Sequence, residues 1–219
     1  MSDTRTRGPE TPARAAADFV GFVPEEAPRR KIELPPPADP APLGLAAFAL
    51  TTFLLSASNA GWTDGGAAWL GFAFAYGGLG QLLAGMWEFR KGNVFGATAF
   101  STYGAFWIGL GLYALLVEGG SPNAQNDLGW ILVAFAIFNT YMLLFSLRVS
   151  VAVFGVFLTL EATEIVLAVG FFQGSDSIIE IGGIVGIVTA IVAWYASAAG
   201  VVNGMGGRPV VPVGRPIWR

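Results

Sequence analysis

Residues 88–118 read EFRKGNVFGATAFSTYGAFWIGLGLYALLVE, and this stretch decides the fold. Arg90 and Lys91 lie near its start, Glu118 lies at its end, and residues 97–117 between them carry no charge. An apolar run of about 18 residues or more is long enough to cross a bilayer as an α-helix. We therefore expect a transmembrane helix here, with charged residues only at the two membrane surfaces.

Five other runs have the same length and apolar character. Together the six predicted spans cover residues 43–61, 67–87, 97–117, 128–146, 151–169 and 181–199. Hydrophobic residues make up 54% of the chain and charged residues only 12%, so a soluble domain would have to hide all of this apolar surface in one core. The sequence therefore predicts an all-α, polytopic membrane protein with six transmembrane helices in one bundle per protomer.

The basic residues orient these predicted spans. All of them lie before the first span, between spans two and three, between spans four and five, or after the sixth. The other three connections hold Asp64, Glu118, Asp127, Asp176 and Glu180. Because Lys and Arg are retained on the cytoplasmic side, we expect a multi-pass protein of the plasma (inner) membrane with both termini in the cytoplasm.

The spans divide the chain into three parts. Residues 1–38 are rich in Pro, Ala and mixed charge, and we interpret them as a disordered cytoplasmic tail. Residues 39–203 form the six-helix transmembrane domain, and residues 204–219 form a short cytoplasmic C-terminal tail. No apolar run precedes residue 43, so we expect no cleavable signal peptide.

The available side chains argue against catalysis. The chain has no His and no Cys, and no Lys or Arg lies inside a predicted span. These absences remove the usual general bases, a Schiff-base lysine and most metal sites. We therefore predict that the protein is not an enzyme and has no catalytic residue, metal site or cofactor. With a net charge of −3 and its cations confined to one membrane surface, we also expect no nucleic acid partner.

Neutral polar side chains are concentrated in the first three predicted spans. They include Thr51, Thr52, Gln81, Thr98 and Ser101. Any single hydroxyl can be explained structurally, since Ser and Thr commonly hydrogen-bond to their own helix. Together with the Gly-rich backbone, the group is better explained by a path for a small polar solute.

Two stretches carry a family resemblance. Residues 39–45 read DPAPLGL, and residues 76–107 read YGGLGQLLAGMWEFRKGNVFGATAFSTYGAFW. The first resembles the NPAPLGL signature of the succinate–acetate permease family, also called acetate uptake transporters, and the second closely resembles that family's second conserved stretch. The PNAQ sequence at 122–125 is similar too, and the likeness extends from residue 39 to about residue 205.

The resemblance implies six helices per subunit and a homohexamer with a separate path through each protomer. It also implies transport of acetate and other short monocarboxylates, with succinate in some members. Three apolar or aromatic side chains narrow the path in that family, and they match Phe48, Tyr103 and Leu158 here. The chain departs from the family pattern at Asp39, where the family has Asn, and at residues 158–164, LTLEATE, where the family is apolar.

Glu161 and Glu164 are the charges in that second departure. An acidic residue in the middle of a span costs about 2.5–3.5 kcal/mol on insertion scales, and no span contains a cation to pair with either. At spacing i, i+3 the two share a helix face. We interpret them as a candidate proton site beyond the constriction. The alternative is a structural role, in which they bond to hydroxyls such as that of Thr159 or line a subunit interface.

We therefore expect a transporter or anion channel for acetate and other short carboxylates. Its partners would be these substrates, the lipid bilayer and other copies of the chain. Two alternatives stay open at this point: a channel for another small solute such as ammonia, and a membrane scaffold or sensor whose polar groups only pack. The sequence does not separate a channel from a proton-coupled carrier.

Overall fold

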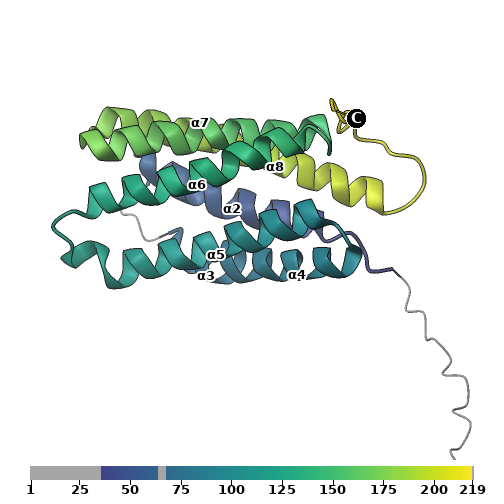
Figure 1. The fold of residues 1–219 in the computed structure, drawn as a ribbon, viewed down its shortest axis with the longest axis horizontal. Helices are drawn as coiled ribbons and strands as arrows, with labels where there is room; N and C mark the ends of the chain where they lie inside the picture. The colour runs from purple at the N-terminus through teal and green to yellow at the C-terminus, as the bar shows by residue number, and fades with distance from the viewer. Residues whose placement is uncertain (1–35, 64–67, 219) are drawn as a thin grey trace, which may run out of the picture. The chain divides into compact units, whose positions relative to one another are not determined.

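The computed structural model describes residues 36–63 and 68–218 (Figure 1). Residues 1–35 of the predicted N-terminal tail, and Asp64 in the first connection, lie outside the described residues. The described part is helical, with no strand in it. Its elements are α2 Ala41–Asn59, α3 Leu70–Phe74, η1 Ala75–Gly80, α4 Gln81–Lys91, α5 Val94–Leu116, η2 Glu118–Gly120, α6 Ala124–Ser146, α7 Val151–Gln173 and α8 Asp176–Gly204.

Five of these helices are long and apolar enough to cross a membrane: α2, α5, α6, α7 and α8. The remaining predicted span is present as one helical run divided into α3, η1 and α4. Successive spans alternate in direction, so that the ends of α4, α6 and α8 lie on the same side of the bundle as the starts of α2, α5 and α7 (Figure 1). The prediction of an all-α membrane fold is confirmed.

The division of the second span has a local cause in packing. η1 is a π-helix, in which the backbone is wider than in an α-helix. A Cβ atom on Gly77 would lie 2.5 Å from Thr51 Oγ1, and one on Gly78 would lie 2.6 Å from Ile108 Cγ1. The glycines therefore let α2 and α5 approach the span closely from two sides. The first residue after the π-helix is Gln81, whose side chain is only 2% exposed.

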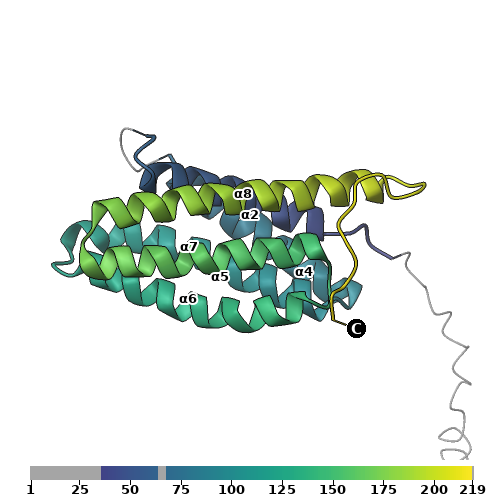
Figure 2. The ribbon, with the colours of Figure 1, turned by 90° about the horizontal axis from the view of Figure 1, so that it is seen from above.

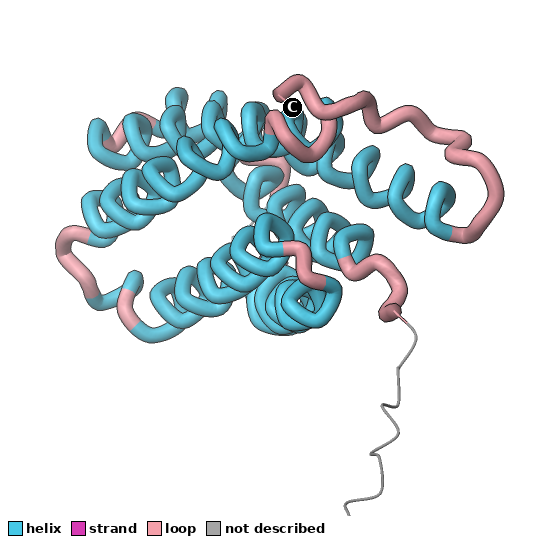
Figure 3. The backbone as a smooth tube through the Cα atoms, turned by 45° about the vertical axis from the view of Figure 1, so that its right-hand side comes forward, coloured by secondary structure: helices cyan, strands magenta, loops and turns pink. Residues whose placement is uncertain are grey.

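The helices pack in two connected groups. α2 packs on one side against α8 and on the other against η1 and α4, while α4 packs against α5. α7 packs against both α6 and α8 (Figure 2). α6 contacts α5 much less than it contacts α7, and the two helices diverge in the view of Figure 3. The interior between these groups is where the cavities described below are found.

Side-chain oxygens accept backbone hydrogen bonds at the starts of α2, α5 and α7, the ends that we predict to face the cytoplasm. Asp39 Oδ1 accepts a hydrogen bond of 3.0 Å from the first backbone N–H of α2, and it also pairs with Lys91 Nζ at 2.8 Å. Asn93 caps α5 and Ser150 caps α7, each through its side-chain oxygen. Asp39 thus performs the capping role expected of Asn at this position, and adds an ion pair between α2 and the end of α4.

Residues 205–218 of the C-terminal tail fold back onto the bundle. The carbonyl oxygen of Val213 accepts a 2.9 Å hydrogen bond from the first turn of α7. The carbonyl oxygen of Leu147 accepts from the backbone N–H of Ile217 at 2.8 Å, and the Arg148 guanidinium lies 5.8 Å from the centre of the Trp218 ring. The tail therefore covers the turn between α6 and α7.

The contact between α2 and α8 supplies a test of the fold. A Cβ atom on Gly183 would lie 2.5 Å from the backbone nitrogen of Ala60 and 2.7 Å from the carbonyl oxygen of Ser56. Because backbone atoms cannot rotate away as a side chain can, we expect Gly183→Ala to destabilise the protein by about 1–3 kcal/mol. The measurement is the thermal unfolding midpoint in detergent.

Gly109→Ala is the matched control, since a Cβ atom there would meet nothing within 4 Å. Equal midpoints for the two variants would contradict the close approach of α2 and α8.

Candidate functional site

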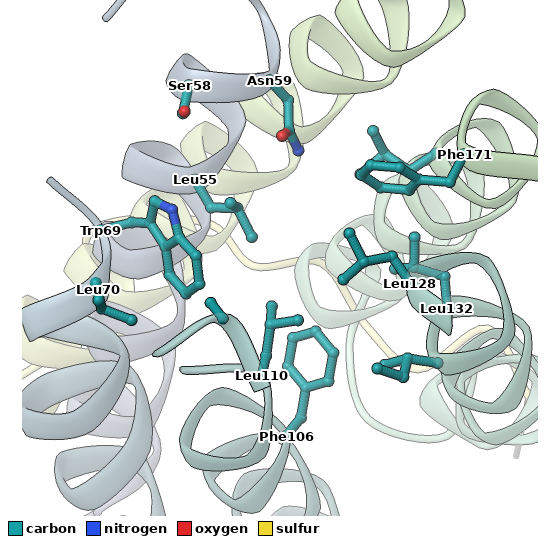
Figure 4. A pocket seen from close by; sticks show the side chains of 13 residues that line it. Leu55, Ser58, Asn59, Trp69, Leu70, Phe106, Leu110, Leu128, Leu132 and Phe171 are labelled. Carbon is teal, nitrogen blue, oxygen red and sulfur yellow. The ribbon is translucent and has the colours of Figure 1, made fainter. Parts of the chain in front are cut away.

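Neighbouring cavities lie between the helices in the described part of the chain. One of them, called here the large cavity, has a volume of about 440 Å³. It is lined by Leu55, Ser58, Asn59, Trp69, Leu70, Phe106, Leu110, Ala114, Leu128, Ile131, Leu132, Leu167 and Phe171. Figure 4 shows Leu55 and Trp69 on one side of it and Leu128 and Phe171 on the other. Its walls are mostly apolar, and the residues come from the ends of helices that we predict to face away from the cytoplasm.

A second cavity, called the middle cavity, adjoins the large one, because Leu55 and Leu167 line both. Its volume is about 50 Å³. It is lined by Phe48, Thr52, Leu55, Ser56, Asn59, Tyr103, Phe106, Trp107, Leu132, Leu160, Thr163, Glu164 and Leu167. This cavity is smaller than the large one, and more of its lining residues carry a polar side chain.

A third cavity, the small cavity, has a volume of about 20 Å³. It is lined by Leu45, Phe48, Gln81, Ala99, Phe100, Tyr103, Val156, Phe157 and Leu160. The middle and small cavities share Phe48 from α2, Tyr103 from α5 and Leu160 from α7. The rings of Phe48 and Tyr103 meet edge to face with centroids 5.8 Å apart. These three side chains therefore separate the two cavities.

The structure brings together two of the three residues that the resemblance assigned to the constriction. Phe48 and Tyr103 are in contact, whereas Leu158 is 48% exposed and lines none of the three cavities. The reason is helical geometry, because residues two apart point about 200° away from each other. Leu160, which is 7% exposed, lies beside the two rings instead.

The five polar residues predicted along the path are divided by the structure. Thr52 lines the middle cavity and Gln81 the small cavity. Thr51 is fully buried and donates a 3.1 Å hydrogen bond to the carbonyl oxygen of Ala47 in its own helix. Its side chain lies against Gly77, so it packs α2 against the second span. Neither Thr51, Thr98 nor Ser101 lines any of the three cavities.

The two glutamates belong to one hydrogen-bonded network across α5, α6 and α7. The Tyr103 hydroxyl lies 3.0 Å from Asn139 Oδ1 and 3.3 Å from Glu164 Oε1. Asn139 Nδ2 donates at 2.6 Å to Glu161 Oε2, and the Thr140 hydroxyl lies 2.8 Å from Glu161 Oε1. Both Glu161 oxygens therefore receive donors from α6. Glu164, which is 3% exposed, is the only one of the pair that lines a cavity.

Three residues of this region were missed by the sequence prediction of the site. Asn139 is fully buried at the centre of the network, and a lone amide in the middle of a span is a signal that could have identified it. Leu160 and Trp107 have no such signal, because Leu and Trp are common throughout the apolar runs. The suggested hydroxyl partner Thr159 bonds instead to the carbonyl oxygen of Gly155 in its own helix, at 2.9 Å.

Comparison with known proteins connects this architecture to a family. The model of the GPR1/FUN34/yaaH family matches residues 22–213. The chain belongs to this family. The match confirms the resemblance read from residues 39–45 and 76–107, since relatives of this chain carry the names of acetate transporters.

Two curated relatives and one solved structure are similar over most of the chain. Acetate permease A of Emericella nidulans is 41% identical over 203 residues, covering 83% of this chain and 67% of that protein. The succinate-acetate/proton symporter SatP of Escherichia coli K12 is 37% identical over 180 residues, covering 81% of this chain and 95% of the relative. The solved structure of the bacterial acetate channel SatP matches with a TM-score of 0.77 at 36% identity, covering 81% of this chain and 99% of that one.

The buried amide at the centre of the network supplies a second test. Asn139 pairs with Tyr103, with Glu161 and with the carbonyl oxygen of Phe157, the last at 2.9 Å. Asn139→Leu leaves these buried groups without their partner, and each unpaired group costs about 1–3 kcal/mol. We expect a clearly lower unfolding midpoint in detergent.

Asn126→Leu is the control, because Asn126 lies on the same helix and is exposed. A similar midpoint for both variants would mean that the network contributes nothing to stability.

Proposed function

We propose that this protein is a membrane transporter or channel for acetate and other short carboxylates, with a path inside each subunit. The observation that carries the proposal is the series of three cavities between the helices, narrowed where Phe48, Tyr103 and Leu160 meet. The names of two relatives support it, since one is called an acetate permease and the other a succinate-acetate/proton symporter.

The walls of the path favour a small acid. Among the described residues, no Lys or Arg lines any of the three cavities, so an anion would find no cation along the path. An unpaired charge among apolar side chains is costly. A short monocarboxylate reduces that cost, because its methyl end suits the rings of Phe48 and Tyr103 while Thr52 and Gln81 offer neutral hydrogen-bond donors.

For the constriction we propose Phe48, Tyr103 and Leu160, with Leu160 in the role that the resemblance implied for Leu158. The sharing of these three side chains by two adjacent cavities supports this assignment. We assign Thr52 and Gln81 to the substrate path, and assign Thr51, Thr98 and Ser101 to packing. Glu164 remains a candidate proton site beside the constriction, and Glu161 is linked to it through Asn139 and Tyr103.

We further propose a plasma (inner) membrane protein with both termini in the cytoplasm. The position of Arg90, Lys91 and Arg148 at one end of the alternating helices supports this orientation. A homohexamer follows from the resemblance, and the large exposed apolar side chains of α6 are consistent with it, since lipid or neighbouring copies have to cover them. The absence of His and Cys from the sequence supports a protein that is not an enzyme.

One observation favours a second candidate substrate, ammonium. Glu164 and the aromatic rings of Tyr103 and Phe106 line the same cavity, and a carboxylate near ring faces attracts a small cation. The same assay must therefore compare acetate with ammonium.

Uptake by liposomes tests the proposed function. We expect purified protein in liposomes to take up labelled acetate saturably and faster than empty liposomes, because the path provides donors and an apolar lining of suitable size. Uptake of labelled succinate and ammonium is measured in parallel. Ammonium uptake without acetate uptake would favour the second candidate, and no uptake of any solute would leave only a scaffold or sensor.

The constriction can be tested in the same liposomes with two leucines on one helix. Leu160→Ala should widen the narrow point, so that butyrate enters faster relative to acetate than it does in the wild type. Leu158→Ala removes the same atoms from the exposed side of α7 and should leave the ratio unchanged. Both variants must first be shown to fold, since a buried Leu→Ala change costs about 2–5 kcal/mol. A changed ratio for Leu158→Ala alone would restore Leu158 to the constriction.

A further inference from the structure

Three of the residues that line the middle cavity carry a buried polar atom that lacks a partner among the described residues. Thr52 Oγ1, Trp107 Nε1 and Glu164 Oε2 are each buried and have no hydrogen bond with any described residue. The three residues come from α2, α5 and α7, are at most 5% exposed, and all line this cavity. Leaving one buried polar group unpaired costs about 1–3 kcal/mol. Because three residues with such groups line one cavity, a polar molecule bound there is a source of the missing partners.

The chemistry of these atoms restricts the ligand. The indole N–H of Trp107 can only donate, and the Thr52 hydroxyl can donate or accept. Glu164 Oε2 accepts when the carboxyl group is ionised and donates when that oxygen carries a proton. The carboxyl group of a ligand can pair with all three atoms. Its two oxygens can accept hydrogen bonds from Trp107 and Thr52, and one proton can lie between the ligand and Glu164.

The hydrogen bonds of Tyr103 indicate where that proton is held before a ligand arrives. Asn139 Nδ2 donates to Glu161 and to the carbonyl oxygen of Phe157, so Asn139 Oδ1 faces Tyr103 as an acceptor. The single hydrogen of the Tyr103 hydroxyl cannot satisfy both Asn139 Oδ1 and an ionised Glu164. A protonated Glu164 resolves the shortage when no ligand is bound, because its Oε1 donates to Tyr103 Oη while Tyr103 donates to Asn139. To share a proton with a bound ligand, Glu164 has to present that proton at Oε2 instead.

Among the residues that the structure describes, no cation acts on Glu164. The titratable groups that act on it are Glu161 on its own helix and Tyr103 on α5. α2 has no charged residue, and α6 contributes Asn139 to the network. Thr189 of α8 faces Thr163, next to Glu164, and its hydroxyl lies 3.0 Å from that of Thr163. An ionised Glu164 beside a substrate anion would thus place two negative charges together with no compensation.

We propose that Glu164, Trp107 and Thr52 bind the carboxyl group of a small monocarboxylic acid, and that Glu164 shares one proton with it. A protonated Glu164 with a carboxylate and an ionised Glu164 with a neutral acid contain the same atoms and the same charge. This site rests on the proposed carboxylate path and adds two residues, Trp107 and Glu164, to its substrate contacts.

The cavity also predicts which acids are accepted. A volume of about 50 Å³ holds a molecule the size of a few waters, which suits acetate and is small for succinate, a molecule about twice as large. Most of the remaining wall is apolar, including Leu55, Phe106 and Leu132. The second carboxylate of succinate would be placed against this wall without a partner, so the site selects monocarboxylic acids.

Acetate binding to the purified protein in detergent tests the site separately from transport. Isothermal titration is carried out from about pH 6 to about pH 9, where acetate in solution is almost entirely the anion. When free Glu164 is ionised, binding must take a proton from solution, so the wild-type dissociation constant should rise by up to about tenfold per pH unit at the alkaline end. Glu164→Gln retains the hydrogen bonds but cannot titrate, and its dissociation constant should not change with pH.

Glu161→Gln is the comparison variant, because it makes the same chemical change three residues away and leaves Glu164 able to titrate. Its dissociation constant should still change with pH, although the change shifts along the pH axis because the charge of Glu161 is removed. Trp107→Phe and Thr52→Val each remove one donor at nearly constant shape, and each should raise the dissociation constant for acetate about tenfold. A Glu164→Gln profile that overlays the wild type, or donor variants with unchanged affinity, would overturn the site. So would wild-type protein that binds ammonium chloride but not sodium acetate. Wild-type protein that binds acetate but does not move it into liposomes would overturn the proposed function and leave the site standing.

Discussion

Every polar group at the depth of the bilayer core must find its partner inside the protein, because hydrocarbon offers none. This constraint explains the helices, which pair their own backbone groups, and it explains why Asn139 lies where three helices meet. The same constraint makes buried polar atoms without a partner worth explaining. Among the described residues, several buried polar atoms have no partner, and three of them belong to residues that line the middle cavity: Thr52, Trp107 and Glu164. The path that we propose therefore passes a place where the pairing rule is broken.

Most of the fold could be predicted from the sequence, because each long uncharged run has the length that a helix needs to cross the bilayer. The π-helix η1 could not be predicted in this way. It lies where Thr51 and Ile108 approach two glycines, which is a tertiary contact that apolar periodicity does not report. The packed C-terminal tail was missed for a similar reason, since the backbone bonds of Leu147 and Val213 depend on no side-chain pattern.

The site was predictable only in part. The family motif predicted Phe48 and Tyr103 as constriction residues, and the structure brings their rings into contact. Leu158 was not brought to them, because α7 is apolar on nearly every side and its sequence does not report which leucine faces inward. Glu164 was noticed in the sequence because inserting a charge into a span costs free energy. How its surroundings differ from those of Glu161 could not be predicted, because the difference depends on which α6 donors reach each carboxyl group.

Within the proposed path, the two sides of the constriction differ in their chemistry. The middle cavity has a carboxyl group, Glu164, whereas the small cavity has an amide, Gln81. A carboxyl group can bind a substrate anion only while a proton is held between them, but an amide N–H can bind the anion with no proton. Passage from one side of Tyr103 to the other therefore separates the substrate from its shared proton. Whether that proton then follows the substrate or stays on Glu164 is the physical difference between a proton-coupled carrier and a channel in this chain.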